Sequence, residues 1–443
     1  MSSILRRRHR AVLAGQPVQI QALDAVRLSL LAALPLAVLA GSPQRVVLSA
    51  AIAAAYVAAA AFTFRRSRSN LAVVGYAAVA AGWMTVSWLR TRYLLHLDSA
   101  QLSYATSKTM YFVAIVLPMS AAVTMMVDRA ADFRPTATSQ VVIGGAVALI
   151  TIAFMGDHFL GADRYAWQGN LIALGTAIAI QPWPIQNIKV SAVIGALGVV
   201  GIMMAGSRQS LAAIVVAMLL SAAYWAAASI FSERGSLYAR MRKSPAGRYA
   251  ALSLILLLLT GAYVAVTYVA DRGVQVASGQ ASAPTYACQC VTDRIISLQM
   301  SAGDRDQLIA HGVQLFLHNP VLGAGLGSFA GAIPNSLAPG ESYQYPHNVP
   351  LEIAAEMGLV GLAIMMAPLL AGWSALLWTG MKRMSAPVAA VLMVVAVFFT
   401  VANVSGDIPS DRGLWIFGIV ALKLGIDAWP KRAAETRSFA RAV

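Results

Sequence analysis

The chain is divided into long apolar runs, and this feature limits its possible folds more than any other. The runs contain few charged side chains and cover residues 26–41, 46–64, 71–89, 109–127, 139–155, 169–186, 190–205, 210–231, 249–270, 350–379, 386–403 and 413–428. A helix needs about 20 apolar residues to cross about 30 Å of hydrocarbon, so the runs predict an all-α polytopic membrane protein with about 12 transmembrane helices. The number of runs excludes a single-span anchor. Their length excludes an outer-membrane barrel, whose short strands alternate between apolar and polar residues.

The charged residues lie mainly between the runs. They make up 12% of the chain, against roughly 25% in an ordinary soluble domain. Lys and Arg number 33 against 18 Asp and Glu. With both termini in the cytoplasm, about twice as many positive residues face the cytoplasm as face the outer side, in agreement with the positive-inside rule. Anionic lipid therefore explains the basic character without nucleic acid. The start MSSILRRRHR lacks a following cleavage site and is interpreted as a cytoplasmic tail rather than a signal peptide.

One connection is far longer than the others. No apolar span occurs between Asp271 and Pro346, a stretch rich in Gly, Ser, Gln and Pro that the topology places outside. Such long connections in compact proteins are usually functional or disordered. Within it, the apolar spacing over Arg305 to Leu317 predicts a helix that folds against the membrane domain. Cys288 and Cys290 also lie here, and they are too few for a disulfide framework or a zinc site, which leaves a local bridge or two free thiols.

The predicted spans are nearly bare of ionisable groups away from their ends, which disfavours a proton-coupled transporter. The distinctive ionisable residues lie instead at the outer surface: Arg208 in a short turn, Arg305 in the long connection, and His347 where that connection enters the next span. Arg208 and Arg305 can each bind a phosphate with a bidentate guanidinium. The alternatives are lipid headgroups for Arg208 and surface ion pairs with Asp304 and Asp306 for Arg305. The spacing of the two aspartates also matches the metal-binding DxD of soluble glycosyltransferases.

His347 lies just before a predicted helix start. Pro350 suits the first turn of a helix, and Asn348 suits the N-cap. The positive end of the helix dipole favours neutral imidazole, the form that can act as a general base. The alternative is an ordinary polar residue at the interface.

Two further patterns near His347 allow more than one interpretation. Glu352 and Glu356 share one helix face, and they either orient polar groups or bond neighbouring helices. The glycines of NPVLGAGLGSF predict a tight turn rather than a phosphate loop, because the Rossmann pattern needs a strand before it.

Taken together, these residues carry a family resemblance. PHNVPLEIAAEMGLVGL resembles the HN-x-x-LE-x-x-x-E-x-G-x-x-G signature of the O-antigen ligase and polymerase superfamily of bacterial inner membranes. SRQ at Ser207 to Gln209 resembles the SR turn of that family, and Arg305 followed by HNPVLGAG resembles its loop segment. The resemblance covers roughly residues 190–400. Ile309 departs from it, since the family often has tryptophan at this position.

The resemblance implies a glycosyltransferase of lipopolysaccharide biosynthesis that moves a glycan from undecaprenyl diphosphate at the periplasmic face. It implies that Arg208 and Arg305 bind the diphosphate, that His347 is the catalytic base, and that Asn348, Glu352 and Ser207 support them. No metal or other cofactor is implied, and the first outer loop, GSPQR, has none of the carboxylates of metal-dependent oligosaccharyltransferases.

The predicted organisation follows the apolar runs: a cytoplasmic tail over 1–25, helices over 26–270, a large periplasmic loop over 271–349, helices over 350–428, and a cytoplasmic tail over 429–443. Because little chain follows Trp429, we expect a ligase with lipid A-core oligosaccharide as acceptor, ahead of an O-antigen polymerase or a protein O-oligosaccharyltransferase. The competing class is a lipid-linked glycan transporter, and a scaffold protein is a third option.

Overall fold

The structure is a computed structural model that describes most of the chain as helix. The described residues are 18–40, 46–64, 66–154, 165–205, 207–232, 247–262, 298–329, 345–383, 385–404 and 406–442. Within these ranges there is no β-strand. The predicted all-α class is therefore confirmed.

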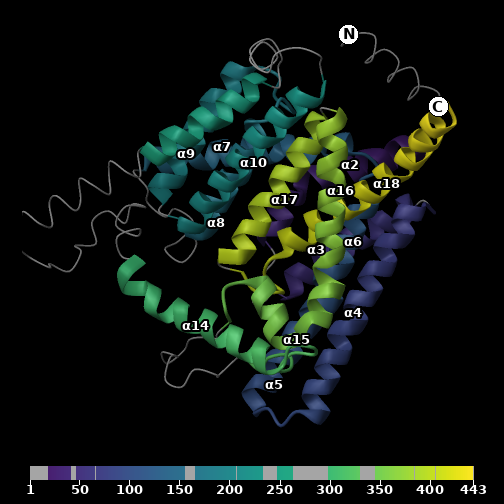
Figure 1. The fold of residues 1–443 in the computed structure, drawn as a ribbon, viewed down its shortest axis with the longest axis vertical. Coiled ribbons are helices and arrows are strands. Elements are labelled where there is room, and N and C mark those ends of the chain that lie inside the picture. Colours follow the sequence, from purple (N-terminus) through teal and green to yellow (C-terminus); the bar gives the residue numbers. More distant parts are fainter. Residues whose placement is uncertain are drawn as a thin grey trace, which may run out of the picture.

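Most of the helices pack side by side (Figure 1). Their bounds are α2 Val18–Ala40, α3 Val46–Thr63, α4 Arg68–Leu94, α5 Ser99–Tyr111, η2 Phe112–Val116, α6 Leu117–Met125, η3 Ala130–Phe133, α7 Arg134–Ala153, α8 Tyr165–Ala179, α9 Ile188–Ala205, α10 Arg208–Ser232, α14 Leu298–His318, α15 Val349–Met365, α16 Ala367–Arg383, α17 Ala386–Val404 and α18 Arg412–Ala442.

Eight helical stretches in the described part of the chain are long and apolar enough to cross a membrane. They are Val46–Thr63, Arg68–Leu94, Gln101–Met125, Ala130–Ala153, Ile188–Ala205, Gln209–Ala228, Val349–Arg383 and Ala386–Val404. The other predicted spans are helical as well, at α2, α8, Gly247–Ala262 and α18. The chain is thus a multi-pass membrane protein, and the count of about 12 spans stays a prediction.

Two helix ends differ from the predicted runs for identifiable reasons. The run 169–186 ends early, at Ala179, because Pro182 and Pro184 follow and cannot continue the hydrogen-bond ladder. The run 350–379 is not one helix, because the backbone leaves helical geometry at Gly358. Helix also extends into both predicted tails, since α2 begins at Val18 and α18 continues to Ala442.

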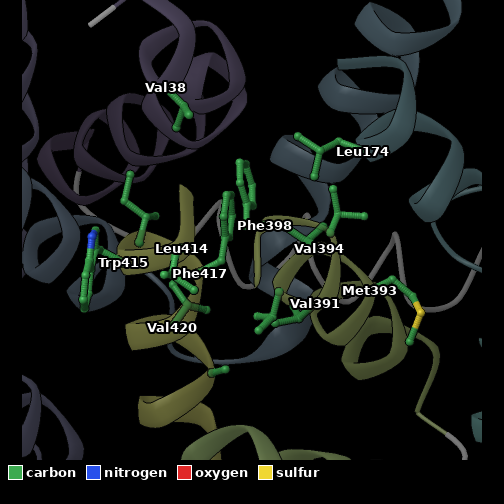
Figure 2. Packing of buried hydrophobic residues seen from close by; sticks show 14 of the residues in the cluster. Val38, Leu174, Val391, Met393, Val394, Phe398, Leu414, Trp415, Phe417 and Val420 are labelled. Carbon is green, nitrogen blue, oxygen red and sulfur yellow. The ribbon is translucent and has the colours of Figure 1, made fainter. Parts of the chain in front are cut away.

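Close packing between helices depends on small residues and on aromatic rings. Gly144 of α7 and Gly175 of α8 meet backbone to backbone, and a Cβ on either would lie within 3 Å of the other helix. Figure 2 shows the centre of the core, where Phe398 of α17 lies beside Phe417 of α18. The two rings stack with centroids 5.1 Å apart. This core holds α17 and α18 against the rest of the bundle.

The side-chain contacts fix the direction of the helices around the site. Ser210 of α10 bonds Asn170 of α8, so these two helices begin at the same end of the bundle. Tyr224, far along α10, donates to the carbonyl of Ser385, just before α17 begins, so α10 and α17 run antiparallel. The end of α17 therefore lies with the starts of α8, α10 and α18. We call this the site end.

A separate group of charges lies at the opposite end of the bundle. Arg27 of α2 donates to the carbonyl of Met126 at 2.6 Å and to Asp132 at 2.9 Å. The buried Lys423 of α18 donates to Asp128 and to the carbonyl of Thr124, both at 3.3 Å. These contacts join α2, α6, η3 and α18.

Candidate active site

The signature segment forms a short half-helix that is reversed by a glycine. Residues 349–357 are helical, Gly358 has φ 67° and ψ −165°, and a second helical segment follows. A Cβ on Gly361 would lie close to both Met357 and Ile353, so the chain folds back on the half-helix after the break. Because Gly358 takes a conformation that is essentially restricted to glycine, the reversal depends on this residue.

Asn348 caps the start of the half-helix, as the sequence predicts. Its side-chain oxygen accepts the N–H of Leu351 at 2.9 Å, and Pro350 lies in the first turn. Its amide nitrogen also donates to the carbonyl of Asn403 at 3.1 Å, which ties the half-helix to the end of α17. The cap therefore orients the residue that precedes it, His347.

His347 lies in a constrained backbone position. Its φ is 53°, the one positive value at a non-glycine residue in the described part of the chain. The side chain is half-buried, and its ring lies 4.3 Å from that of Tyr345, measured between centroids. Positive φ is uncommon at a non-glycine residue, and it persists where surrounding contacts enforce it, often at functional sites.

A glycine-rich loop, residues 319–329, fills the break at Gly358. A helix break leaves backbone carbonyls unpaired on one side and N–H groups unpaired on the other, and both need partners inside a membrane protein. The loop supplies both kinds. Four hydrogen bonds result: Ala324 N–H to Ala355 C=O at 2.8 Å, Gly325 N–H to Glu356 C=O at 3.0 Å, Leu359 N–H to Pro320 C=O at 2.8 Å, and Val360 N–H to Val321 C=O at 3.2 Å.

The glycines of this loop are required by geometry, which confirms the predicted turn. Gly323, Gly325 and Gly327 all have positive φ. A Cβ on Gly323 would lie 2.3 Å from the backbone of Glu356. Arg90 of α4 then clamps the loop by donating to the carbonyls of Leu322 and Gly323 at 2.7 and 2.9 Å.

Beneath His347, a buried lysine bridges the two glutamates of the signature. Lys108 of α5 donates to Glu352, and it donates to Glu356 at 2.6 Å. All three side chains are fully buried. The glutamates therefore bond a neighbouring helix, one of the two roles that the sequence left open. The expectation that the spans are nearly bare of charge is wrong at this point.

The hydropathy pattern does not reveal Lys108, because the predicted apolar run begins one residue after it, at position 109. The structure starts α5 earlier, at Ser99, where Asp98 and Gln101 form a capping box. The pattern Asp-x-x-Gln is a recognised sign of a helix start. It would have placed Lys108 inside a helix rather than in a loop.

A turn over residues 406–411 closes the site from the other side. Its Ile408 N–H donates to Glu352 at 2.9 Å, and the Ile408 carbonyl accepts from the indole of Trp415 at 2.7 Å. Burial raises the pKa of Asp407, although the N–H of Ser410 partly opposes the shift. Burial, together with Asp407 and Glu352, raises the pKa of Asp411 well above its ordinary value.

The structure places the backbones of both predicted arginines without describing their side chains. Arg208 is the first residue of α10 and therefore lies at the site end. Ser207 beside it is buried, and its hydroxyl lies 2.6 Å from that of Ser210. Ser207 thus contacts the first turn of α10, and it also packs against Gly169 of α8.

Arg305 lies in α14, which confirms the predicted helix and extends it to Leu298–His318. Seven residues later, Gly312 packs against Leu351 of the half-helix. Ile309, at the position of the family tryptophan, is exposed. Near the same contact, the ring of His311 meets Phe329 at 5.4 Å, and burial lowers the pKa of His311. Figure 1 shows α14 reaching α15 near the end of the bundle.

The start of α10 with Arg208, the half-helix behind His347 and the 406–411 turn all lie at the site end, and the hydrogen bond from Ile408 to Glu352 joins the turn directly to the half-helix. The glycine loop joins α14, with Arg305, directly to the half-helix. Cys288 and Cys290 lie outside the described residues, as does the first outer loop at 41–45.

Comparison with known proteins supports the resemblance found in the sequence. The family model described as O-Antigen ligase matches residues 193–366. This segment contains Arg208, Arg305 and His347, together with the glycine loop and both signature glutamates. No curated protein matches the chain. The family match and the helical membrane fold agree, and both indicate similarity to the O-antigen ligase superfamily.

Proposed function

We propose that this protein ligates O-antigen polysaccharide from undecaprenyl diphosphate to lipid A-core oligosaccharide at the periplasmic face of the bacterial inner membrane. Both termini would then lie in the cytoplasm, with the loop 271–349 in the periplasm. The observation that supports the proposal most directly is the position of His347. It precedes a capped half-helix that docks on the same loop that leads back to Arg305.

In the proposed reaction, a hydroxyl of the acceptor sugar attacks the anomeric carbon of the donor. His347 removes the hydroxyl proton, the new glycosidic bond forms, and the bond from the anomeric carbon to the diphosphate oxygen breaks. Attack opposite the leaving group inverts the anomeric centre. General-base catalysis of this kind contributes about 10²- to 10⁴-fold in rate.

Arg208 and Arg305 would stabilise the negative charge that grows on the leaving diphosphate. Such stabilisation is strongest where donors are fixed before the reaction, and paired guanidiniums suit phosphate oxygens. The free energy comes from the carrier bond, so neither ATP nor a metal is needed. Asn348 and Glu352 would hold the half-helix, and Ser207 would hold the turn that leads into α10.

The test uses purified protein with an undecaprenyl-diphosphate glycan and lipid A-core, without ATP or added metal, scored for a larger lipopolysaccharide band. We expect the band with the unchanged protein and its loss in His347→Ala. The matched control is His318→Ala, because His318 is exposed and its ring bonds only the Gln314 carbonyl of its own helix. Equal loss in both variants would count against the base.

Other products would indicate the alternative functions. Longer glycans on the carrier lipid would indicate a polymerase, and glycan on a protein acceptor would indicate an oligosaccharyltransferase. Movement of the intact donor across a vesicle membrane, with His347→Ala still active, would indicate a transporter.

A further inference from the structure

Three segments of the site are joined through the buried side chain of Lys108 and its two glutamate partners. The half-helix contributes Glu352 and Glu356, which are its two ion-pair partners. The 406–411 turn is joined through the N–H of Ile408 on Glu352. The backbone amides of Gly327 and Phe329 face the Glu356 carboxylate, which joins the glycine loop.

The position of the half-helix along its axis depends on these contacts. Glu352 and Glu356 lie four positions apart on one helix face, so one ammonium group between them fixes both the rotation of the two-turn segment and its position along the helix axis. His347 lies immediately before this segment, with its backbone already in a constrained conformation. A shift of the half-helix must therefore move His347.

We propose that Lys108 is a positioning residue of the transfer reaction, which fixes His347 relative to the helix that carries Arg305. The proposal rests on the proposed function. Lys108 touches neither substrate in it. It acts through Glu352 and Glu356, which couple the half-helix to the turn and to the glycine loop.

Removing the ammonium group has a specific chemical consequence. Lys108→Met leaves two buried carboxylates facing each other with no cation between them, an arrangement tolerated only when protons replace the missing charge. As pH rises and these carboxylates lose their protons, their repulsion should therefore displace the half-helix of the variant further. The other titratable groups near the carboxylates are Tyr104 of α5 and Asp407 and Asp411 of the turn, and Tyr345 lies near Tyr104.

A second buried lysine supplies a matched control. Lys423 is also almost fully buried and also bonds a carboxylate, but it contacts Asp128 and the Thr124 carbonyl at the opposite end of the bundle. Lys423→Met removes the same chemical group without touching the half-helix.

The experiment measures kcat, KM for the donor, and the pH profile of glycan transfer in Lys108→Met, Lys423→Met and the neutralised variant Lys108→Met/Glu352→Gln/Glu356→Gln. Misplacing a reacting group by about 1 Å costs on the order of 10²-fold in rate. We expect a kcat loss of that order in Lys108→Met, with donor KM nearly unchanged and activity falling further as pH rises. The neutralised variant should recover part of kcat and lose the added pH dependence, whereas Lys423→Met should keep the normal profile.

A readout that needs no substrate separates this proposal from the proposed function. Diethyl pyrocarbonate modifies accessible imidazoles, and the rate at His347 can be followed by peptide mass spectrometry. We expect a changed rate at His347 in Lys108→Met but not in Lys423→Met, with the exposed His318 unchanged in both. If the unchanged protein transfers no glycan while this pattern holds, the ligase function is wrong, and what stands is that Lys108 fixes the position of His347.

Two results would overturn the positioning role. One is a Lys108→Met protein with normal kcat, pH profile and His347 modification. The other is an equal kcat loss in the two methionine variants with neither pH profile altered, because this would indicate general destabilisation. If Lys108→Met does not fold, the neutralised variant is measured in its place. A kcat of this variant as low as that of His347→Ala, with His347 modified at the normal rate, would also count against the positioning role.

Discussion

The break at Gly358 gives the sharpest prediction about this fold. In Gly358→Ala, the new Cβ would lie 2.3 Å from the carbonyl oxygen of Val321 and 2.6 Å from the nitrogen of Gly323. Both are backbone atoms, so no side-chain rotation relieves the contact. The backbone conformation itself costs about 1–3 kcal/mol at a non-glycine residue.

The expected damage is local undocking of the glycine loop from the half-helix. Four backbone hydrogen bonds cross this contact, and each contributes about 1 kcal/mol net. Losing all four would raise the population of the open loop by about a thousandfold, because each 1.4 kcal/mol is a factor of ten. Transfer should fall with it, since the loop links His347 to Arg305.

Hydrogen exchange read by peptide mass spectrometry measures this directly in the purified protein. Peptides spanning 319–329 and 355–361 should lose protection in Gly358→Ala, while those from α17 keep it. Gly145→Ala is the control, because a Cβ at Gly145 in α7 meets nothing within 4 Å and alanine favours helix by about 1 kcal/mol. Normal protection and normal transfer in Gly358→Ala would refute the account of the break.

Three further outcomes are expected. Because burial raises the folded-state pKa of Asp411, stability should be greatest below the unfolded value of about 4 and decrease as pH rises above it. Asp411→Asn should reduce this dependence and raise Tm at pH 7, as measured by thermal unfolding from pH 4 to 8; a lower Tm at pH 7 would contradict it. Arg90→Ala removes two charged hydrogen bonds worth about 1.5–3 kcal/mol each, so limited proteolysis should cut the glycine loop faster than in Arg92→Ala, whose exposed guanidinium lies over Trp88. Chelation with EDTA should leave transfer unchanged, and loss with recovery by one added metal would overturn the metal-free mechanism.

Much of the site could be predicted because its signals are local. The cap at Asn348 and the proline in the first turn involve residues within three positions of each other. The amphipathic spacing after Arg305 predicted α14 for the same reason, since helix periodicity is visible within a short window. The ordered motifs that carry the family resemblance are also short. The family match confirms this resemblance.

The sequence alone determined that this chain forms a bundle of apolar helices in a membrane, because hydrophobic length and periodicity are properties of consecutive residues. Only the tertiary structure decided what lies around His347. Lys108 is 244 positions from Glu352, and Ile408 is 56 positions from it. Contacts of this kind depend on how the helices pack. Burial then makes Lys108, Glu352 and Glu356, which resemble ordinary charges near span ends in the sequence, partners in buried ion pairs. The reversal at Gly358 likewise needs the glycine loop to satisfy its open backbone groups, so neither segment reveals it without the other.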